Sequence, residues 1–500
     1  MSERIAQLRE RLAEQIDLRT ASELLNWDQN TMMPPDGAEG RAEVLGTLER
    51  IAHDQFIDDE TGRLLEAAEQ ELNGSPPESD DASLVRVSRR SYDKATRVPS
   101  ELAAELAKAA SFGQEAWIAA RANSDFAAFA PHLERNLDLA RQYVACFDEF
   151  ACPYDALLDD YDAKMTTAQV KALFDELRSE LVPMIQTLSE NAEAVDASAL
   201  HGSFPVDGQR RLVAETVTQM GFNSDGWRLD DAVHPFAAGI GLGDVRITTR
   251  WDESYFASAL YGGMHECGHG LYEAGIAAAL RRTPLGGGAS LSVHESQSRL
   301  WENMVGRGQP YTGVLAARVN NIFGVRIEPD TLYRAVNKVE PSYIRVEADE
   351  ATYGLHIVLR FELEQELIEG RLSVADLPAA WNERFRQYFG IDVPDDAHGV
   401  LQDVHWSAGL IGYFPTYQLG NLIAGQLWQR VNADLPDLSE RIAAGELQPL
   451  REWLLENVHR HGAKFTTGEL LERVVEGPIA VAPFISYLKR KLSAVYGVEL

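Results

Sequence analysis

The sequence has little of what builds disulfide frameworks or membrane spans. Only three cysteines occur in 500 residues, Cys146, Cys152 and Cys267. Folds that depend on disulfide bonds usually have many cysteines in even number, so this set argues against such a fold. No stretch approaches the roughly eighteen consecutive apolar residues of a transmembrane helix. The opening segment carries Ile5 and Leu8 at helical spacing between charges, which predicts an amphipathic helix and no signal peptide. We therefore expect a cytoplasmic protein that neither crosses nor enters a membrane.

Basic residues are also scarce. Lys and Arg number 46 against 77 Asp and Glu, which gives a formal charge of −31. A surface that binds nucleic acid or an anionic membrane needs clustered Lys and Arg, so this balance argues against both kinds of partner. The sequence shows no internal repeat and no low-complexity tract.

The hydrophobic pattern of the sequence has mostly the periodicity of α-helices. Apolar residues recur at steps of three and four behind plausible caps, and they predict helices over 100–125, 166–192, 210–220, 257–275, 291–306, 346–369 and 375–388, with several more after 416. The one convincing strand is 244–251, where Val245 and Ile247 alternate with Arg246 and Thr248.

The segment HECGH suggests a metal site. His265 and His269 are four residues apart, so on a helix both imidazoles project from one face, with Glu266 beside the first. In the H-E-x-x-H arrangement, two imidazoles bind zinc and the glutamate acts as a base. The alternative is an ordinary core helix that happens to carry two histidines.

A catalytic zinc site needs a third protein ligand. Glu273 lies about 12 Å along the helix axis from His265 at about 1.5 Å per residue, too far to share an ion. The metzincin extension also fails, because Tyr272 and Gly275 stand at its Gly and His positions. The third ligand must therefore come from another element.

Glu295 is the candidate for that ligand. It lies one turn into the next predicted helix, which a short loop places antiparallel to the first. The alternative is a capping box, in which Ser292 and Glu295 only satisfy backbone N–H groups. We interpret His294 and Glu302 as structural or as supports of the ligands, and Cys267 as a packing residue that points away from them.

These motifs resemble one known family. HECGH followed by the glutamate of HESQS is similar to the carboxypeptidase Taq family of metallocarboxypeptidases, and further motifs of that family occur in order along the chain: NWDQNTMMPPDGAEGRA (26–42), HPF (234–236), DVRIT (244–248), IRVEAD (344–349) and GVLQDVHW (399–406). The resemblance covers nearly the whole chain and reaches every motif position. It therefore favours the metal-site interpretation of HECGH and of Glu295.

The resemblance implies a metal-dependent carboxypeptidase that removes C-terminal amino acids from peptides with a free C-terminus. One divalent ion, zinc or else cobalt, would be bound by His265, His269 and Glu295, and it would lower the pKa of a bound water from near 16 to about 7. Glu266 would accept that water's proton and pass it to the leaving amine.

Two further roles need candidates. The oxyanion of the reaction needs a hydrogen-bond donor, for which we name His405 and Tyr417; Tyr417 could instead be a buried aromatic with a satisfied hydroxyl. The substrate's terminal carboxylate needs a cation, which a bidentate arginine suits. Arg345 is favoured over Arg246, although either could instead pair with the aspartate of its own motif.

The fold we expect is mostly α: a single large helical domain over 1–500 with a long, deep active-site cleft. A small sheet containing 244–250 would lie near the metal-binding helix, and N-terminal helices (about 1–125) would form a cleft wall or lid. The resemblance also implies a homodimer. Two alternatives stay open: an oligopeptidase that cuts internally along an open-ended cleft, and a non-catalytic helical binding protein.

Overall fold

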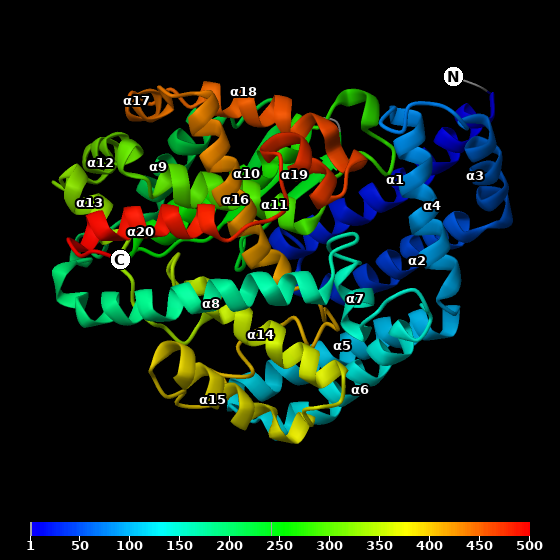
Figure 1. The fold of residues 1–500 in the computed structure, drawn as a ribbon, viewed down its shortest axis with the longest axis horizontal. Helices are drawn as coiled ribbons and strands as arrows, with labels where there is room; N and C mark the ends of the chain where they lie inside the picture. Colours follow the sequence, from blue (N-terminus) through cyan, green and yellow to red (C-terminus); the bar gives the residue numbers. More distant parts are fainter. Residues whose placement is uncertain (1–2, 242) are drawn as a thin grey trace. The chain divides into compact units, whose positions relative to one another are not determined.

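A computed structural model describes residues 3–241 and 243–500, and helices dominate it (Figure 1). The mostly helical fold with a small sheet is therefore confirmed. The chain forms two compact units. The first unit comprises Met1–Thr96, Ser198–Val336 and Leu427–Pro478, and the second comprises Arg97–Ala197, Asn337–Gln426 and Ile479–Leu500. The single domain, its long cleft and the wall or lid of N-terminal helices stay predictions.

The first unit contains most of the helices and the whole sheet. Its elements are α1 (Glu3–Thr31), η1 (Pro35–Gly37), α2 (Ala38–Ile57), α3 (Asp59–Glu71), α4 (Asp80–Arg97), η3 (Ser198–Leu200), α9 (Val206–Met220), β1 (Trp227–Asp231), β2 (Ala237–Gly241), β3 (Asp244–Thr249), α10 (Phe256–Gly275), η4 (Ala278–Leu280), α11 (Leu291–Arg299), η5 (Leu300–Gly306), α12 (Gln309–Phe323), α13 (Pro329–Ala335), α17 (Leu438–Ala443), α18 (Gln448–Asn457), η8 (His459–Lys464) and α19 (Thr467–Val475).

The sheet has the strand order β1-β3-β2, with β1 parallel and β2 antiparallel to β3. The predicted strand is correct but ends at Thr249, and its alternation buries Val245 and Ile247. Strands β1 and β2 were not predicted from the sequence. Each has five residues, and β2 is the glycine-rich AAGIG, so neither shows a clear two-residue alternation.

Helix α10 packs closely against its neighbours. A Cβ atom at Gly268 would lie 2.7 Å from the Cα of Ser298 in α11, and one at Gly270 would lie 2.6 Å from the ring of Trp227 in β1. Both distances are well inside van der Waals contact, so only glycine fits at these positions. The uncharged residues around HECGH therefore hold this helix between α11 and the sheet.

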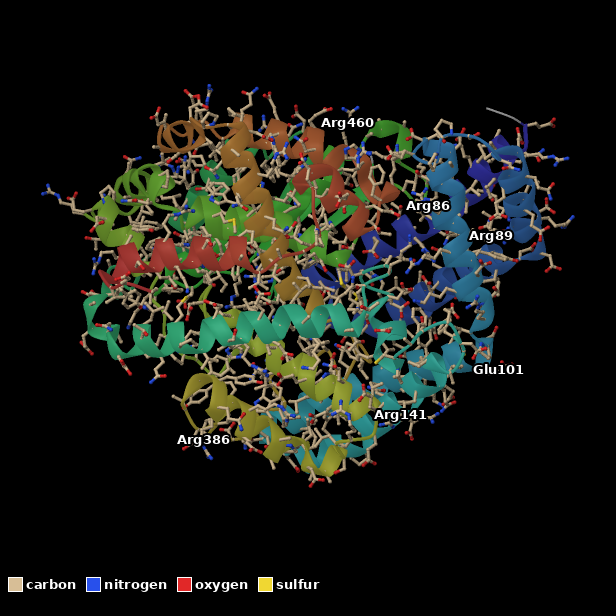
Figure 2. All side chains as sticks on the ribbon, in the orientation of Figure 1. Arg86, Arg89, Glu101, Arg141, Arg386 and Arg460 are labelled. Atoms are coloured by element: carbon tan, nitrogen blue, oxygen red, sulfur yellow. The ribbon has the colours of Figure 1, made fainter. Side chains whose placement is uncertain are left out.

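The N-terminal amphipathic helix is confirmed. In α1 the apolar face buries Ile5, Leu8 and Leu12 in a cluster with residues of α2, α3 and α4. Polar contacts add to this packing: Arg86 of α4, labelled in Figure 2, donates to the carbonyl oxygen of Lys464 at 2.6 Å. This bond ties α4 to the segment before α19 within the same unit.

The second unit is helical. It contains α5 (Ser100–Asn123), α6 (Phe126–Val144), α7 (Pro153–Leu158), α8 (Thr167–Glu190), η2 (Ala192–Ala194), η6 (Arg345–Glu347), α14 (Tyr353–Ile368), η7 (Val374–Asp376), α15 (Leu377–Phe389) and α20 (Ala482–Tyr496); α16 (Pro415–Asp434) begins here and continues into the first unit. Helices α5 and α6 lie side by side (Figure 1). Along the described part of the chain, no helix is both long and apolar enough to cross a membrane.

One predicted helix begins later than expected. The periodic pattern suggested a start at 346, but α14 begins at Tyr353. Asp349 is the reason, because its carboxylate accepts backbone N–H bonds from Ala351 and Thr352 at 2.9 and 3.0 Å. The aspartate thus holds residues 351 and 352 in a turn ahead of α14, and the helix begins only after that turn.

Candidate active site

The structure brings together the three residues that the sequence suggested as metal ligands. His265 and His269 lie one turn apart on α10, and their Nε2 atoms are 3.6 and 3.4 Å from Oε2 of Glu295 on α11. One ligand atom from each residue lies within 4.8 Å of the other two. Two imidazole nitrogens and a carboxylate oxygen at this spacing can share one ion at bond lengths of about 2 Å.

Glu295 does not form the capping box that was the alternative. The cap of α11 is Ser290, whose side chain accepts from the backbone N–H of Val293 at 3.1 Å. The interpretation that paired Glu295 with Ser292 is therefore wrong. Instead, Oε1 of Glu295 accepts from Nε of Arg299 at 2.7 Å. That bond orients the carboxylate and turns Oε2 toward the histidines.

A wide turn continues α11. Residues Leu300–Gly306 form a π-helix, a rare element that is often found at functional sites. It contains Glu302, whose Oε2 lies 2.9 Å from Nδ1 of His265. Arg299 and Arg307 also donate to Glu302, at 3.4 and 3.2 Å. His265 thus has a carboxylate near each of its ring nitrogens. The helix predicted over 291–306 is present, but its second half is a π-helix.

His269 has a different neighbour. Its Nδ1 lies 2.6 Å from Nδ1 of His294, and Nε2 of His294 lies 2.7 Å from Oε1 of Glu273. His294 therefore contacts a candidate ligand without facing the ion position itself. Glu273 lies one turn beyond His269 on α10, which agrees with the sequence argument that it is too far from His265 to share an ion.

The electrostatics of this cluster suit a cation. Burial, together with the nearby carboxylates of Glu295 and Glu302 and partly offset by His265, raises the pKa of Glu266 to about 7. Burial lowers the pKa of His269 to about 3, which keeps the ring neutral and able to ligate. For Glu295, burial is outweighed by Arg299 and both histidines, which hold its pKa well below the ordinary value. The residues present fit a divalent ion.

A second cluster of buried charge lies in the second unit, around Asp403. Arg345 donates from Nε and Nη2 to Oδ1 of Asp403 at 3.0 and 2.9 Å, and from Nη1 to the hydroxyl of Tyr353 at 2.9 Å. Arg360 donates from Nε to Oδ2 at 2.7 Å. Although burial opposes ionisation, the two guanidiniums hold the pKa of Asp403 well below its usual range. The suggested pairing of Arg345 with Asp349 is wrong, since Arg345 pairs with Asp403 and Asp349 accepts backbone N–H bonds from the residues just before α14.

His405 and Tyr417 contact each other in this unit. Nε2 of His405 lies 3.1 Å from the hydroxyl oxygen of Tyr417. Burial lowers the pKa of His405 to about 3, and Arg345 and Arg360 act in the same direction against the effect of Asp403. His405 is therefore neutral at pH 7. The two donors named for the oxyanion form one hydrogen-bonded pair.

Arg246 pairs with the aspartate of its own motif, which was the structural alternative to binding the substrate. Its Nε and Nη2 donate to the two carboxylate oxygens of Asp244 at 2.8 and 2.7 Å. Its guanidinium also lies over the ring of Trp27 in α1, 4.5 Å from the centroid, and Arg228 lies over the same ring at 5.0 Å. These contacts attach α1 to the sheet through cation–π stacking.

Comparisons with known proteins decide the family. The sequence profile described as "Carboxypeptidase Taq (M32) metallopeptidase" matches residues 7–492. The chain belongs to the carboxypeptidase Taq (M32) metallopeptidase family. It is 41% identical over 493 residues to thermostable carboxypeptidase 1 of Thermus thermophilus, with 96% of each chain covered. It is 36% identical to carboxypeptidase 1 of Bacillus subtilis, with 95% of each covered.

Solved structures of the M32 family agree. An M32 carboxypeptidase from Deinococcus radiodurans R1 is 39% identical and superposes with a TM-score of 0.95, over 99% of this chain and 100% of the other. An Apo-Mg structure of Pyrococcus furiosus carboxypeptidase is 32% identical with a TM-score of 0.94, over 98% and 99%. The chain is therefore a metal-dependent carboxypeptidase, a peptide hydrolase. The non-catalytic alternative is wrong, and the endopeptidase alternative is not favoured.

Several residues of both clusters were not singled out by the sequence analysis. Arg299 and Arg307 carry no spacing signal beyond the four residues that separate Arg299 from Glu295. Arg360 interrupts the apolar run IVLRF (357–361) of α14, and a buried arginine there signals a carboxylate partner. Asp403 was visible only as part of the GVLQDVHW motif, and Glu273 was considered only as a ligand.

Proposed function

We propose that this M32 enzyme holds one divalent ion on His265, His269 and Glu295, with zinc the first choice and cobalt the second, because imidazole and carboxylate ligands suit both. The observation that carries the proposal is the convergence of one ligand atom from each residue within 4.8 Å. A bound ion would activate water and polarise the scissile carbonyl. The substrates are peptides with a free C-terminus.

Glu266 is the proposed general base. It is buried on α10 beside His265, and its raised pKa of about 7 suits a group that takes up and releases a proton near neutral pH. In the proposed reaction, its carboxylate accepts a proton from the attacking water. The same group then passes the proton to the nitrogen of the departing amino acid.

Arg345 is the proposed partner of the substrate's terminal carboxylate. Arg345 and Arg360 bring two positive charges to the single carboxylate of Asp403, so the cluster keeps a surplus positive charge that favours an anion. Arg246 is the weaker candidate, because Asp244 balances its charge one to one, whereas Asp403 is shared by two guanidiniums. The roles of His405 and Tyr417 as oxyanion donors stay proposals from the family resemblance, supported by the hydrogen bond between them.

The assembly and location follow the same resemblance. We propose a homodimer and a cytoplasmic enzyme. Light scattering coupled to size-exclusion chromatography tests the first proposal directly: a mass of twice 55.4 kDa supports it, and a mass of 55.4 kDa contradicts it.

The test of the function uses a short peptide and its C-terminally amidated twin. The metal-loaded enzyme should release amino acids stepwise from the free-acid peptide and leave the amide intact. Mass spectrometry of the products over time distinguishes this from internal cleavage, which would cut both peptides. Glu266→Gln with its metal retained is the matched control, and it should cleave neither peptide at a comparable rate.

A further inference from the structure

We propose that His294 and Glu273 form a hydrogen-bonded chain that fixes the orientation and the tautomer of His269, and that this chain strengthens metal binding. The proposal rests on the proposed function, in which His269 is a metal ligand. It makes His294 and Glu273 positioning residues, because neither needs to touch the ion or the substrate.

The distances allow only one simple arrangement of protons along this chain. Glu273, as a carboxylate, only accepts, so Nε2 of His294, 2.7 Å away, must carry a hydrogen. A neutral His294 then has a lone pair on Nδ1. Nδ1 of His269, 2.6 Å from that atom, must therefore be the donor. This leaves the lone pair of His269 on Nε2, the atom that lies 3.4 Å from Glu295.

The surroundings confine both members of the chain. A Cβ atom at Gly288 would lie 2.9 Å from Cδ2 of His294, and one at Gly239 in β2 would lie 2.8 Å from Oε2 of Glu273. The ring of Tyr272 packs against His294 with centroids 5.2 Å apart. Glycine at 288 and at 239 therefore leaves just enough space for the imidazole of His294 and the carboxylate of Glu273, and neither side chain has much room to move.

The other ligand histidine is supported differently. Nδ1 of His265 meets the carboxylate of Glu302 directly, and Arg299 and Arg307 hold that carboxylate in place. A carboxylate that accepts from a ligand histidine fixes its tautomer, and loss of such a partner typically weakens metal binding by about 10- to 100-fold. Nδ1 of His269 instead reaches the carboxylate of Glu273 through His294, so the orientation of the His269 ring depends on two hydrogen bonds in series.

The competing explanation is purely structural. His294 on α11 and Glu273 on α10 could simply bind the two helices together, as any cross-helix ion pair would. A structural pair changes the stability of the metal-free protein and leaves its affinity for metal unchanged. A positioning chain changes the affinity, and it makes the two residues act as one unit.

The test measures zinc affinity by competition with a chromophoric chelator, together with thermal unfolding of the metal-free protein. His294→Leu should weaken zinc binding by about 10- to 100-fold. His294→Asn, whose amide can both accept from His269 and donate to Glu273, should recover most of the loss. His461→Leu is the matched control, because His461 is also a half-buried histidine of the first unit and its ring packs on Phe465. It should bind zinc as the wild type does.

A second comparison separates the two explanations. Glu273→Leu should weaken zinc binding, and the double variant with His294→Leu should be no weaker than His294→Leu alone. Losses that add would overturn the proposal, as would zinc affinity within twofold of wild type in His294→Leu. If His294→Leu does not fold, Glu273→Gln and His294→Asn carry the same comparison. A wild type that binds no zinc would instead contradict the proposed function.

Discussion

The two compact units bury charge of opposite sign. In the first unit, Glu295 and Glu302 lie with Glu266 and two histidines, and two arginines partly balance them. In the second unit, Arg345 and Arg360 share one aspartate. The first cluster keeps a surplus of acceptors and lone pairs, and the second keeps a surplus of donors and positive charge.

A surplus of charge destabilises a protein interior, because the free energy lost on removing the charge from water is not fully offset by a partner of opposite charge. The retention of both surpluses is understandable if each cluster completes its charge balance with a ligand. A divalent cation would do so in the first unit, and a carboxylate would do so in the second. This contrast is what we expect if the proposed metal site belongs to the first cluster and the proposed carboxylate recognition to the second.

The largest expected effect concerns the first cluster. Glu266→Gln keeps the size and removes the proton acceptor, so kcat should fall by about 10³-fold, within the usual range for a lost general base. Metal content measured by mass spectrometry should stay at the wild-type level, because Glu266 is not among the proposed ligands. A kcat within tenfold of wild type would remove Glu266 from the mechanism.

The next effect tests whether the second unit also supplies a donor to the reaction. Tyr417→Phe should lower kcat by about 10²-fold, as loss of one oxyanion donor does, with KM little changed. Tyr388→Phe is a matched control, because the Tyr388 hydroxyl contacts Glu362 at 2.5 Å and not His405. Equal kinetics of the two variants would show that the Tyr417 hydroxyl has only a structural role.

A smaller effect concerns substrate recognition. Arg345→Lys keeps the charge and loses the planar, bidentate geometry, so KM for a free-acid peptide should rise by about tenfold, with a smaller change in kcat. Arg246→Lys is the comparison variant, and its KM should stay near wild type because Asp244 balances the charge of Arg246 and leaves no surplus for a substrate carboxylate. The assignment fails if the two substitutions exchange these results.

The last effect is on stability and concerns a buried carboxylate of the second unit, Glu364. Burial raises the pKa of Glu364 to about 7, even though Tyr154, Trp406 and the N–H of Gly412 donate to it. A folded pKa above the unfolded value of 4.5 stabilises the fold at low pH, and this contribution is lost as pH rises toward 7.

The stability of the wild type relative to Glu364→Gln should therefore fall by about 3 kcal/mol between pH 4.5 and pH 7, at about 1.4 kcal/mol per pKa unit. Urea unfolding of both proteins at several pH values measures this difference. A difference that stays constant with pH would mean that Glu364 titrates alike in the folded and unfolded chains.

Local patterns predicted the first cluster well. The four-residue spacing of His265 and His269 gave one helix face, and α10 covers the predicted helix. The approach of Glu295 was predicted from two successive helices, although the connection between them, residues 276–290, is longer than the expected short loop and contains η4. Its alternative failed because Ser290, two residues before Ser292, took the cap. For contacts between elements that follow each other in the chain, hydrophobic periodicity and turn residues were sufficient to predict the contact.

Long-range pairings were beyond such reasoning. Arg345 and Asp403 are far apart in sequence, and the obvious partner in the arginine's own motif, Asp349, instead accepts from backbone N–H groups just before α14. The link from His269 through His294 to Glu273 depends on the side-chain orientations of two packed helices. Neither arrangement has a spacing of its own, so both required coordinates.

The most direct test of the account is the zinc content and zinc affinity of the wild type and of Glu295→Gln, after removal of all metal and reconstitution. The account predicts one ion per chain in the wild type. In the variant, which replaces a charged ligand with a neutral amide of the same size, zinc binding should be lost or weakened by at least 100-fold, about 3 kcal/mol. A variant that binds one zinc ion as tightly as the wild type would contradict the metal site on which the account rests.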